Sequence, residues 1–421
     1  MIVVGAGLAG LSAAARLRSA GVKPLVLEAS DEVGGRIRSR RIEGRVADLG
    51  GEWVGSRHVR VTRLAHRLRL HLEPTKALGR PVLWRGEEQS GVARLPPVPM
   101  VQRLRWLRAF REAWRLARQL DPDRPWASPG AESLDELSFG SWLAGLGLRG
   151  DAYRHTSALV EALTSTPIEK LSLLHVLWWL RRADGPFAAL RTTFQMEVRE
   201  GAQAIPTRLA EELGESVVLE TPVVGIRQDA SVEVETDSGR RYVAQRAIVS
   251  IPVTLTGRVR FEPPLPEALQ GLSRLRIDPL TKLFALLPPG LRVRHRAVIG
   301  GRPLSAAYRS SDRVVGFAPP AYEDRSDSEL LDDLASAFGV SKGRLRSPIV
   351  FRWKRQPHVP GCDIGFRPGE LCRHGPSLRR PHGLVHFAGS ERSSWPNNME
   401  GAVESGVRAA EEAIASVRAG D

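Results

Sequence analysis

Three glycines near the N-terminus have the spacing that lets a protein backbone approach a phosphate closely. Gly5, Gly7 and Gly10 form the pattern Gly-x-Gly-x-x-Gly directly after the apolar run Ile2–Val4. The first glycine permits a tight turn, the second leaves room for a pyrophosphate, and the third allows a helix to pack on a strand. Glu28 follows 18 residues after Gly10, where its carboxylate can accept hydrogen bonds from a ribose. Together these residues predict the binding of a dinucleotide.

A strand, a helix and a second strand must hold these residues in place. The apolar spacing over residues 11–17 predicts the helix, and residues 24–27, ending just before Glu28, predict the second strand. The first turn of that helix offers free N–H groups and the positive end of its dipole to the phosphates. The neighbouring residues that we expect at the same site are Ala6, Leu8, Ala9 and Ala29.

Two further pairs of glycines follow, each after a run that is typical of a strand. Paired glycines permit a close backbone approach to a ligand or a positive φ angle. A dinucleotide that passes several such loops must be long, and this favours FAD over NAD as the cofactor. The residues of the two loops that we expect beside it are Gly34, Gly35 and Arg36 in the first, and Gly50, Gly51, Glu52 and Trp53 in the second.

The C-terminal part of the sequence carries a second signature. A strand-like run ends in Gly389-Ser390-Glu391, where backbone groups can contact the ribityl chain of a flavin. A helix predicted to begin near Met399 and to include Ala402 can point its positive end at the flavin ring. Paired with the N-terminal glycine pattern, this segment resembles the second flavin-binding signature of the flavin-dependent amine oxidase family, the group of monoamine and polyamine oxidases. The similarity extends over nearly the whole chain.

The resemblance implies an α/β fold in which a Rossmann-like FAD-binding domain, with a two-part flavin signature, is interleaved with a mixed α+β substrate domain. The segments expected in the FAD-binding domain are residues 1–78, 201–258 and 351–421; those expected in the substrate domain are the mostly helical residues 79–200 and residues 259–350. A chain of 421 residues is also too long for a single core. The resemblance further implies cofactor contacts from Val223, to the adenine, and from Trp353.

Lys282 interrupts an apolar, strand-like run, Leu280–Leu287. An ammonium in such a strand is unfavourable to bury without a partner. By resemblance, Lys282 corresponds to the family lysine that holds a water against flavin N5 and assists the reaction with oxygen, so it is our candidate catalytic residue. The alternative is a lysine that faces solvent on an alternating strand. Only six of the 61 basic residues are Lys, and the two cations are not interchangeable where a compact donor is needed.

Cys362 lies in the spacing Trp353-x8-Cys362 and directly precedes Asp363. By resemblance to monoamine oxidases with covalently attached flavin, a cysteine at this spacing bonds to the 8α carbon of the ring. Attack requires a thiolate, and a neighbouring aspartate tends to raise the thiol pKa. Covalent attachment and a buried cysteine that acts as a small hydrophobic residue therefore both stay open.

The sequence departs from the family where the substrate amine is held. Many amine oxidases place it between two aromatic rings, and by resemblance those rings fall at positions occupied by Asp363 and Asn398. Without the pair, a simple aryl-alkyl amine is not the expected substrate. Asp363 can instead pair with a cationic amine, and Asn398 can hydrogen-bond a polar substrate. The alternative is that Asp363 turns to solvent, because carboxylates are seldom buried unpaired.

The resemblance implies an FAD-dependent oxidoreductase, first of all an amine oxidase or dehydrogenase. Hydride passes from the carbon next to the amine nitrogen to flavin N5, and O2 then reoxidises the flavin to give H2O2. The first alternative is a C–C desaturase or dehydrogenase of the same fold, similar to protoporphyrinogen oxidase or to carotenoid desaturases, because the aromatic pair is absent. The second is a flavoprotein without catalytic activity.

Composition limits the other partners. The net charge of +14 is spread along the chain and not gathered in a tail, so we expect no nucleic-acid partner. No apolar stretch reaches the ~18 residues that a membrane span requires, and we recognise no secretory leader. Two cysteines, Cys362 and Cys372, imply no disulfide framework. We therefore expect a cytoplasmic protein with a small-molecule amine substrate, O2 as electron acceptor and no metal ion.

Overall fold

Five parallel strands form the sheet that supports the N-terminal glycines. The computed structural model describes residues 1–75, 82–85, 88–92, 98–186, 188–189, 194–293, 295–300, 304–359 and 361–419. The strand order is β10 (Val217–Val218), β2 (Leu25–Leu27), β1 (Ile2–Val4), β14 (Ala247–Val249) and β21 (Val385–Phe387). Val3 and Val26 pack into one apolar cluster and Ile2 and Leu27 into another. Both faces of this sheet are therefore covered, which explains why its strands are almost wholly apolar.

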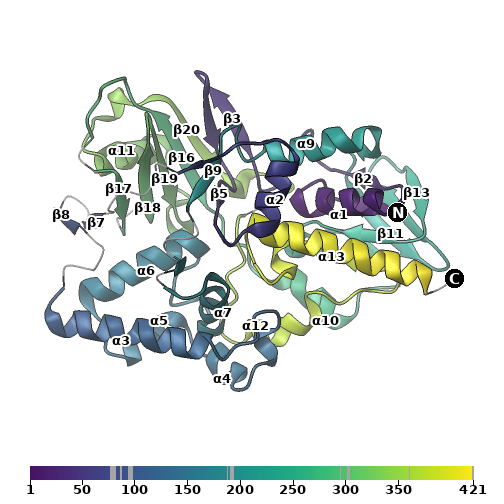
Figure 1. The fold of residues 1–421 in the computed structure, drawn as a ribbon, viewed down its shortest axis with the longest axis horizontal. Coiled ribbons are helices and arrows are strands. Elements are labelled where there is room, and N and C mark those ends of the chain that lie inside the picture. The colour runs from purple at the N-terminus through teal and green to yellow at the C-terminus, as the bar shows by residue number, and fades with distance from the viewer. Residues whose placement is uncertain are drawn as a thin grey trace.

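Four described helices contribute to the cluster on the Val3 face. They are α1 (Leu8–Ser19), α2 (Val59–Arg67), α9 (Ala204–Leu213) and α13 (Met399–Arg418). The N- and C-terminal helices α1 and α13 lie side by side (Figure 1). At Gly406, an added Cβ would lie only 2.1 Å from the backbone oxygen of Ala9. This close contact brings both expected flavin signatures to one place, and the helix predicted to begin near Met399 is confirmed.

The opposite face of the sheet packs against a smaller four-stranded sheet. Its order is β13 (Arg241–Ala244), β12 (Val232–Thr236), β11 (Val223–Gln228) and β15 (Arg260–Glu262). Val232 and Val234 share an apolar cluster with Ile2, whereas Glu233 and Glu235 lie on the other side of the strand. The short helix α10 (Glu267–Gln270) follows this sheet.

A seven-stranded sheet and a layer of helices make up the other end of the molecule (Figure 1). The sheet order is β20 (Arg346–Arg352), β16 (Thr281–Leu286), β19 (Arg313–Ala318), β18 (Ala306–Ser310), β17 (Ala297–Ile299), β7 (Val82–Arg85) and β8 (Glu88–Val92), and α11 (Asp327–Ala337) packs on it. The helices are α3 (Met100–Ala117), α4 (Ala131–Asp135), α5 (Phe139–Gly145), α6 (Gly150–Thr164), α7 (Leu173–Ala183) and α12 (Glu370–His374).

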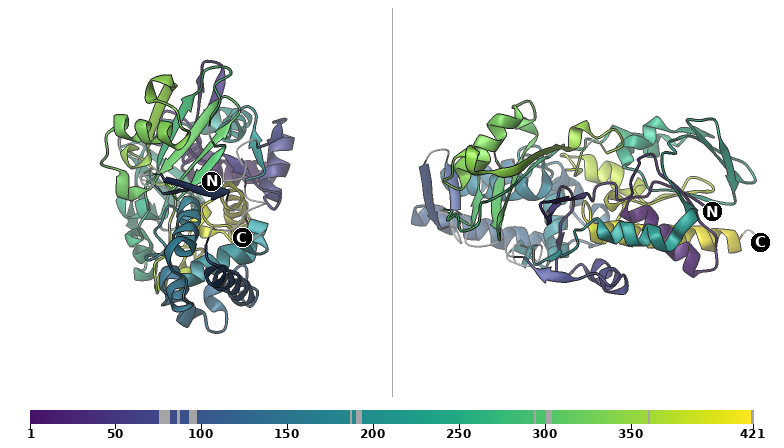
Figure 2. Two further views of the ribbon diagram at one scale, coloured as in Figure 1. Left: turned by 90° about the vertical axis from the view of Figure 1, so that its left-hand side faces the viewer. Right: turned by 90° about the horizontal axis from the view of Figure 1, so that it is seen from above.

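Short elements join the two ends. These are the hairpin β3 (Ser39–Ile42) and β4 (Arg45–Asp48), the sheet β5 (Trp53–Val54), β9 (Met196–Val198) and β6 (Leu72–Pro74), and the helix α2 (Val59–Arg67). Both chain termini lie at the end that holds α1 and α13, and the views in Figure 2 agree. Among the described residues, no helix combines the length and the apolar character needed to cross a membrane.

At three of the expected segment boundaries, elements from different segments pair or pack with one another. β9 pairs with β5 and β6, so residues 196–198 join the N-terminal segment. β15 pairs with β11, so that sheet continues past residue 258. α12 packs against α4 and places part of the C-terminal segment in the helical layer. These long-range contacts are not encoded in the local sequence. The boundary at 78/79 lies outside the described residues, and the division into two domains stays a prediction.

Candidate functional site

A cavity of about 520 Å³ lies at the carboxyl edge of the five-stranded sheet. Its wall includes Gly5 after β1, Glu28 after β2, Ser250 after β14 and Gly389 close after β21. The carboxyl ends of parallel strands meet at one edge, and in open α/β sheets this edge is where ligands bind. The cavity continues toward the seven-stranded sheet and the helical layer, because Lys282 of β16 also lines it.

The first glycine loop faces the cavity as predicted. Gly5, Gly7, Leu8 and Ala9 line it. Gly7 is the N-cap of α1, no side chain caps that helix, and a Cβ at Gly7 would have no neighbour within 4 Å. The first turn of α1 therefore presents N–H groups and the positive end of its dipole to open space, which suits a pyrophosphate.

Two residues of that loop do not line the cavity. Gly10 packs against the strand end, and a Cβ there would lie 2.0 Å from the backbone oxygen of Gly5. Ala6 turns its N–H to Glu28, which accepts at 2.6 Å through Oε2, while Oε1 accepts from the N–H of Ser30 at 2.9 Å. These two bonds fix the buried carboxylate of Glu28 in the cavity wall. Ala6 therefore supports the site by orienting Glu28, and Gly10 supports it by letting α1 pack closely on the strand end.

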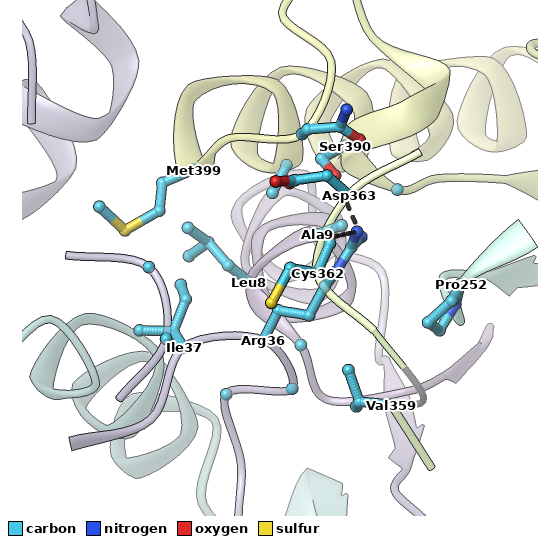
Figure 3. Close-up of a pocket in the computed structure, with 18 of the residues that line it drawn as sticks. Leu8, Ala9, Arg36, Ile37, Pro252, Val359, Cys362, Asp363, Ser390 and Met399 are labelled. Atoms are coloured by element: carbon cyan, nitrogen blue, oxygen red, sulfur yellow. Dashed lines mark hydrogen bonds between the residues drawn. The ribbon is translucent and has the colours of Figure 1, made fainter. Parts of the chain in front are cut away.

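The second glycine loop crosses the first. Gly34 bridges to Gly7, and Gly35 has a φ of +58° and would place a Cβ 3.4 Å from the Cα of Gly7. The side chain of Arg36 then spans the cavity wall and donates to the backbone oxygen of Cys362 and to Ser390 Oγ, both at 3.0 Å (Figure 3). The second glycine loop therefore contacts both the N-terminal glycine signature, at Gly7, and the C-terminal flavin signature, at Ser390.

Glu391 was expected beside the cofactor, but it lies behind the cavity wall. It is fully buried and forms an ion pair with Arg36. Burial alone would raise its pKa, but the ion pair and hydrogen bond with Arg36 hold the pKa of Glu391 below its usual value. Glu391 therefore compensates the positive charge of Arg36, whose guanidinium is also held by Cys362 and Ser390.

Lys282 is almost completely buried, so the alternative of a solvent-facing lysine is wrong. Its ammonium donates to Glu52 Oε2 at 2.7 Å and to the backbone oxygen of Gly50 at 3.2 Å. The hydroxyl of Tyr308 donates to the second oxygen of Glu52 at 2.5 Å. The rings of Trp53 and Phe317 lie 5.8 and 5.4 Å from the ammonium. A compact cation is thus held at one point of the cavity wall.

Asp48 lies next to this network and gives a pH-dependence prediction. Burial, and then the nearby Glu52, raise its pKa to about 6, while Ser39, Lys282 and the N–H of Ala202 oppose the rise. A raised pKa means that the folded protein holds the proton more tightly than the unfolded chain. The stabilisation it provides is therefore full at low pH and is lost as pH rises from about 4 to about 6.

We expect Asp48→Asn to remove this pH dependence. Both hydrogen bonds to Asp48 end on Oδ1, which an asparagine retains. Between pH 4 and pH 7 the wild type should lose up to about 3 kcal/mol relative to the variant, at 1.4 kcal/mol per pKa unit. Denaturant unfolding at a series of pH values measures this difference, and parallel stability curves for the two proteins would contradict the prediction.

Cys362 and Trp353 lie on the cavity wall, as the resemblance implied. The indole of Trp353 is buried and donates to the backbone oxygen of Leu49 at 2.9 Å. Burial of the Cys362 thiol raises its pKa, and the adjacent Asp363 raises it further, whereas Arg36 and Lys282 act in the opposite direction. The thiol is consequently a weak nucleophile at neutral pH.

The two positions that replace the aromatic pair both line the cavity. Asp363 is half-buried and accepts from Ser165 Oγ at 3.2 Å, so it does not turn to solvent. Asn398 is the N-cap of α13, and its Oδ1 accepts from the N–H of Gly401 at 3.1 Å. Because the cap occupies Oδ1, its amide N–H groups are what Asn398 can offer a ligand.

The remaining expected cofactor contacts also lie on the wall. They are Ala29, Gly50, Gly51, Val223, Ser390, Met399 and Ala402. Val223 and Glu28 thus line the same cavity as Asp363, Asn398 and Lys282. Uncapped N–H groups at α1, a carboxylate at the ribose position and a second helix end at α13 fit FAD in one orientation along this edge.

The sequence analysis did not identify the residues that the helical layer contributes to the cavity wall. Ser165 follows α6 with a φ of +55°, and His175 and Trp179 lie on one face of α7. Burial lowers the pKa of His175 to about 4, so its imidazole is neutral. The i,i+4 spacing of His175 and Trp179 is a signal that could have been used, whereas nothing local identifies Ser165.

Comparisons with known proteins agree with this geometry. A model of the family described as flavin containing amine oxidoreductase matches residues 8–414. Human flavin-containing amine oxidase B is 30% identical over 450 residues, which cover 98% of this chain and 86% of that protein. The structure of wild-type putrescine oxidase bound to putrescine superposes with a TM-score of 0.88 at 26% identity, covering 98% of each chain. Cyclohexylamine oxidase from Brevibacterium oxydans gives 0.89 at 26% identity, covering 99% of each.

Proposed function

The chain belongs to the family of flavin-containing amine oxidoreductases, and we propose that its cavity holds FAD lengthwise along the carboxyl edge of the five-stranded sheet. It is an FAD-dependent enzyme of the amine oxidase class. The adenosine end of FAD fits Glu28 and Val223, and the pyrophosphate fits the uncapped start of α1 at Gly7. The flavin ring then lies between Lys282 and Met399. The observation that carries this orientation is that both flavin signatures line one continuous cavity.

When bound, FAD supplies the hydride acceptor for the carbon next to the amine nitrogen, and we propose O2 as the oxidant that restores it with formation of H2O2. The protein supplies position and charge. Lys282 holds a fixed ammonium at the wall through Glu52 and Gly50. The helix α13 directs its positive N-terminal end into the same space. Both features stabilise negative charge that develops near them.

Aromatic side chains help to keep water out of the part of the cavity where we place the flavin ring and the amine. Trp53 packs edge-on against Phe194 with ring centres 4.6 Å apart, and it also contacts Phe317. These three rings line the cavity together with Trp179. A wall of this kind strengthens the electrostatic effect of Lys282, because the interaction between charges grows as water is excluded.

We propose an aliphatic amine as the substrate class. Asp363 and Asn398 occupy the positions that an aromatic pair would take in many relatives, so the site lacks two flat surfaces for an aryl group. The putrescine oxidase neighbour is named for, and was solved with, an aliphatic diamine, and the second neighbour is named for cyclohexylamine. These names support the proposal that a polar, non-aromatic amine enters here.

Anaerobic reduction of the bound flavin tests this function. The FAD-loaded protein is mixed with a panel of aliphatic and aryl-alkyl amines without oxygen, and flavin absorbance near its visible maximum is followed. We expect aliphatic amines to bleach the flavin and O2 to restore it with formation of one H2O2. Bleaching by a substrate with a C–C bond to desaturate, and by no amine, would replace this proposal with the desaturase alternative.

We expect FAD to be held without a covalent bond. The thiol of Cys362 faces the cavity, but burial and Asp363 raise its pKa and disfavour the thiolate that attack requires. Intact mass measurement of the denatured protein should give the polypeptide mass of 46.2 kDa. A gain of one FAD that disappears in Cys362→Ala would contradict this expectation and establish the covalent link.

A further inference from the structure

The carboxylate of Asp363 lines the cavity and has no counter-ion among the residues that the structure describes. No described Lys, Arg or His side chain forms an ion pair with it, and its hydrogen bond from Ser165 Oγ uses Oδ2. The guanidinium of Arg36, which interacts electrostatically with Asp363, is engaged by Glu391, by Ser390 and by the backbone of Cys362. Figure 3 shows the Asp363 carboxylate and the Cys362 sulfur directed toward the side of the cavity where Met399 lies.

The groups around Asp363 leave its carboxylate poised between its two protonation states. Burial raises the pKa of Asp363 to about 7; Arg36 and the Ser165 hydroxyl lower it, and Glu391 and Asp278 raise it. The other titratable or charged side chains that border it or share the cavity wall are Cys362, Lys282, His58, His175, His358, Glu28, Glu52 and Arg258. A carboxylate at this position therefore gains most from a cation that arrives with the ligand.

We propose that Asp363 binds the substrate as an alkylammonium ion and then takes its proton. In this step the N–H bond of R-CH2-NH3⁺ breaks, a bond from the proton to the carboxylate of Asp363 forms, and the neutral amine R-CH2-NH2 remains beside a neutral carboxylic acid. No electrons leave either partner. The step is needed because an ammonium has no lone pair to support loss of hydride from the adjacent carbon, whereas the neutral amine has one.

Exclusion of water from the ion pair favours this transfer. An alkylammonium resembles the lysine side chain, with a pKa of about 10.4 in water. Removal of water from an ion pair disfavours both charged forms, which lowers the ammonium pKa and raises the carboxylate pKa until the two approach one another. Ser165 holds one carboxylate oxygen through Oδ2, so Oδ1 is the oxygen that we assign to the substrate.

The inference rests on the proposed function and narrows its substrate class. It selects amines that are protonated at neutral pH and excludes carboxylates and neutral amides as good ligands. It also assigns to Asp363 a task that an aromatic ring in the same place cannot perform, because a ring has no proton-accepting group of suitable pKa. In this proposal Asp363 contacts the substrate directly and accepts its proton, and it is therefore a catalytic residue.

The first test measures binding and not turnover. tert-Butylammonium has no hydrogen on the carbon next to nitrogen, so it binds without being oxidised. Its dissociation constant is measured from changes in flavin absorbance of the FAD-loaded protein between pH 5.5 and pH 9. For the wild type we expect a constant affinity above pH 7 and a loss of about tenfold per pH unit below it, because protonation of Asp363 competes with the ligand.

Asp363→Asn is the matched variant, since it keeps size and removes the charge. We expect its affinity for tert-butylammonium to fall by about tenfold or more at pH 8 and to lose its pH dependence. Asp363→Glu restores a carboxylate and should restore the slope. Both variants are first checked for FAD content and thermal unfolding. If Asp363→Asn does not hold FAD, the comparison of wild type with Asp363→Glu still decides whether a carboxylate titration governs binding.

The second test follows anaerobic flavin reduction by a monoamine that reduces the wild type. Loss of a positioned base typically costs 10²- to 10⁴-fold in rate. We expect Asp363→Asn to be at least about 100-fold slower at pH 7.5 and to approach the wild-type rate as pH nears the pKa of the free amine, where solvent has already removed the proton. Recovery at high pH distinguishes a lost base from a distorted site.

Three outcomes would overturn the inference. The first is equal pH profiles for wild type and Asp363→Asn. The second is a slow variant that does not recover at high pH. The third is a defect confined to diamines, which would make Asp363 a receptor for a distant ammonium and not for the reacting one. Failure of the proposed function looks different, because no amine would then reduce the wild-type flavin even though tert-butylammonium could still bind.

Discussion

Replacing Lys282 with methionine is expected to lower the free energy of unfolding by about 3–5 kcal/mol, the range for breaking a buried ion pair from one side. The side chains of Lys282 and Glu52 are each only 3% exposed, and their 2.7 Å contact compensates both charges. Methionine fills the space of the lysine stem but leaves the carboxylate of Glu52 with the Tyr308 hydroxyl alone. Chemical denaturation of wild type and variant at pH 7 measures the loss.

The double variant Lys282→Met, Glu52→Gln separates loss of charge compensation from loss of packing. The glutamine side chain is neutral and could still accept from Tyr308, so no uncompensated charge remains. We expect the double variant to recover at least half of the loss, because replacing a whole buried pair with neutral side chains is often close to neutral. If the loss of unfolding free energy in the double variant equals the sum of the losses in Lys282→Met and in Glu52→Gln, the ion pair is not the source of the stability.

Lys282→Met is also expected to slow the reaction of the enzyme with O2. This part follows from the proposed position of the flavin near Lys282, where a fixed cation stabilises developing negative charge. Stopped-flow mixing of amine-reduced protein with buffer containing O2 measures the rate, and a decrease of about tenfold or more is expected. An unchanged rate would place the flavin elsewhere in the cavity or the oxygen reaction away from Lys282.

Gly10→Ala is expected to damage the protein whether or not FAD is present. The added Cβ would lie 2.0 Å from the backbone oxygen of Gly5 and 2.5 Å from Ser250 Oγ, and backbone cannot move aside as a flexible side chain does. Overpacking of this kind costs about 1–3 kcal/mol or more. Because α1 must shift away from β1, we also expect FAD affinity to fall by more than tenfold.

Gly7→Ala is the matched control, because it adds the same methyl group three residues earlier. A Cβ at Gly7 has no neighbour within 4 Å, and its φ of −69° suits any residue. The FAD-free variant should therefore lose no more than about 1 kcal/mol, because alanine is a poorer N-cap than glycine but causes no clash here. Its FAD affinity should nevertheless fall, since the methyl group occupies the space proposed for the pyrophosphate.

Thermal unfolding and FAD titration of both variants complete this experiment. Fluorescence quenching of FAD on binding gives the dissociation constants. The expected pattern is a large loss of both stability and FAD affinity in Gly10→Ala, and a loss of FAD affinity with only a small loss of stability in Gly7→Ala. Normal FAD binding in Gly7→Ala would show that the cofactor does not pass the start of α1, and normal stability of Gly10→Ala would show that α1 packs less tightly on the sheet than the 2.0 Å approach requires.

Local sequence patterns were sufficient for the elements that bind the cofactor. The spacing of Gly5, Gly7 and Gly10 predicted a strand, a turn and a helix, and the structure has β1 and α1 there. Glu28 was predicted at the end of the second strand, and a helix near Met399; both are found. Such motifs can be read in sequence because they encode backbone conformations within a few residues, through glycine freedom, apolar spacing and helix ends.

The partners of the charged residues could be decided only by the tertiary structure. Lys282 was recognised as an unusual residue, but its contact with Glu52 joins positions 230 apart. Glu391 forms an ion pair with Arg36, across a separation that the local sequence cannot specify. Ser165 reaches Asp363 only because α6 ends beside the loop that carries Cys362. These contacts depend on strand order and helix packing, which arise from the burial of apolar surface over the whole chain and not from any short run of residues.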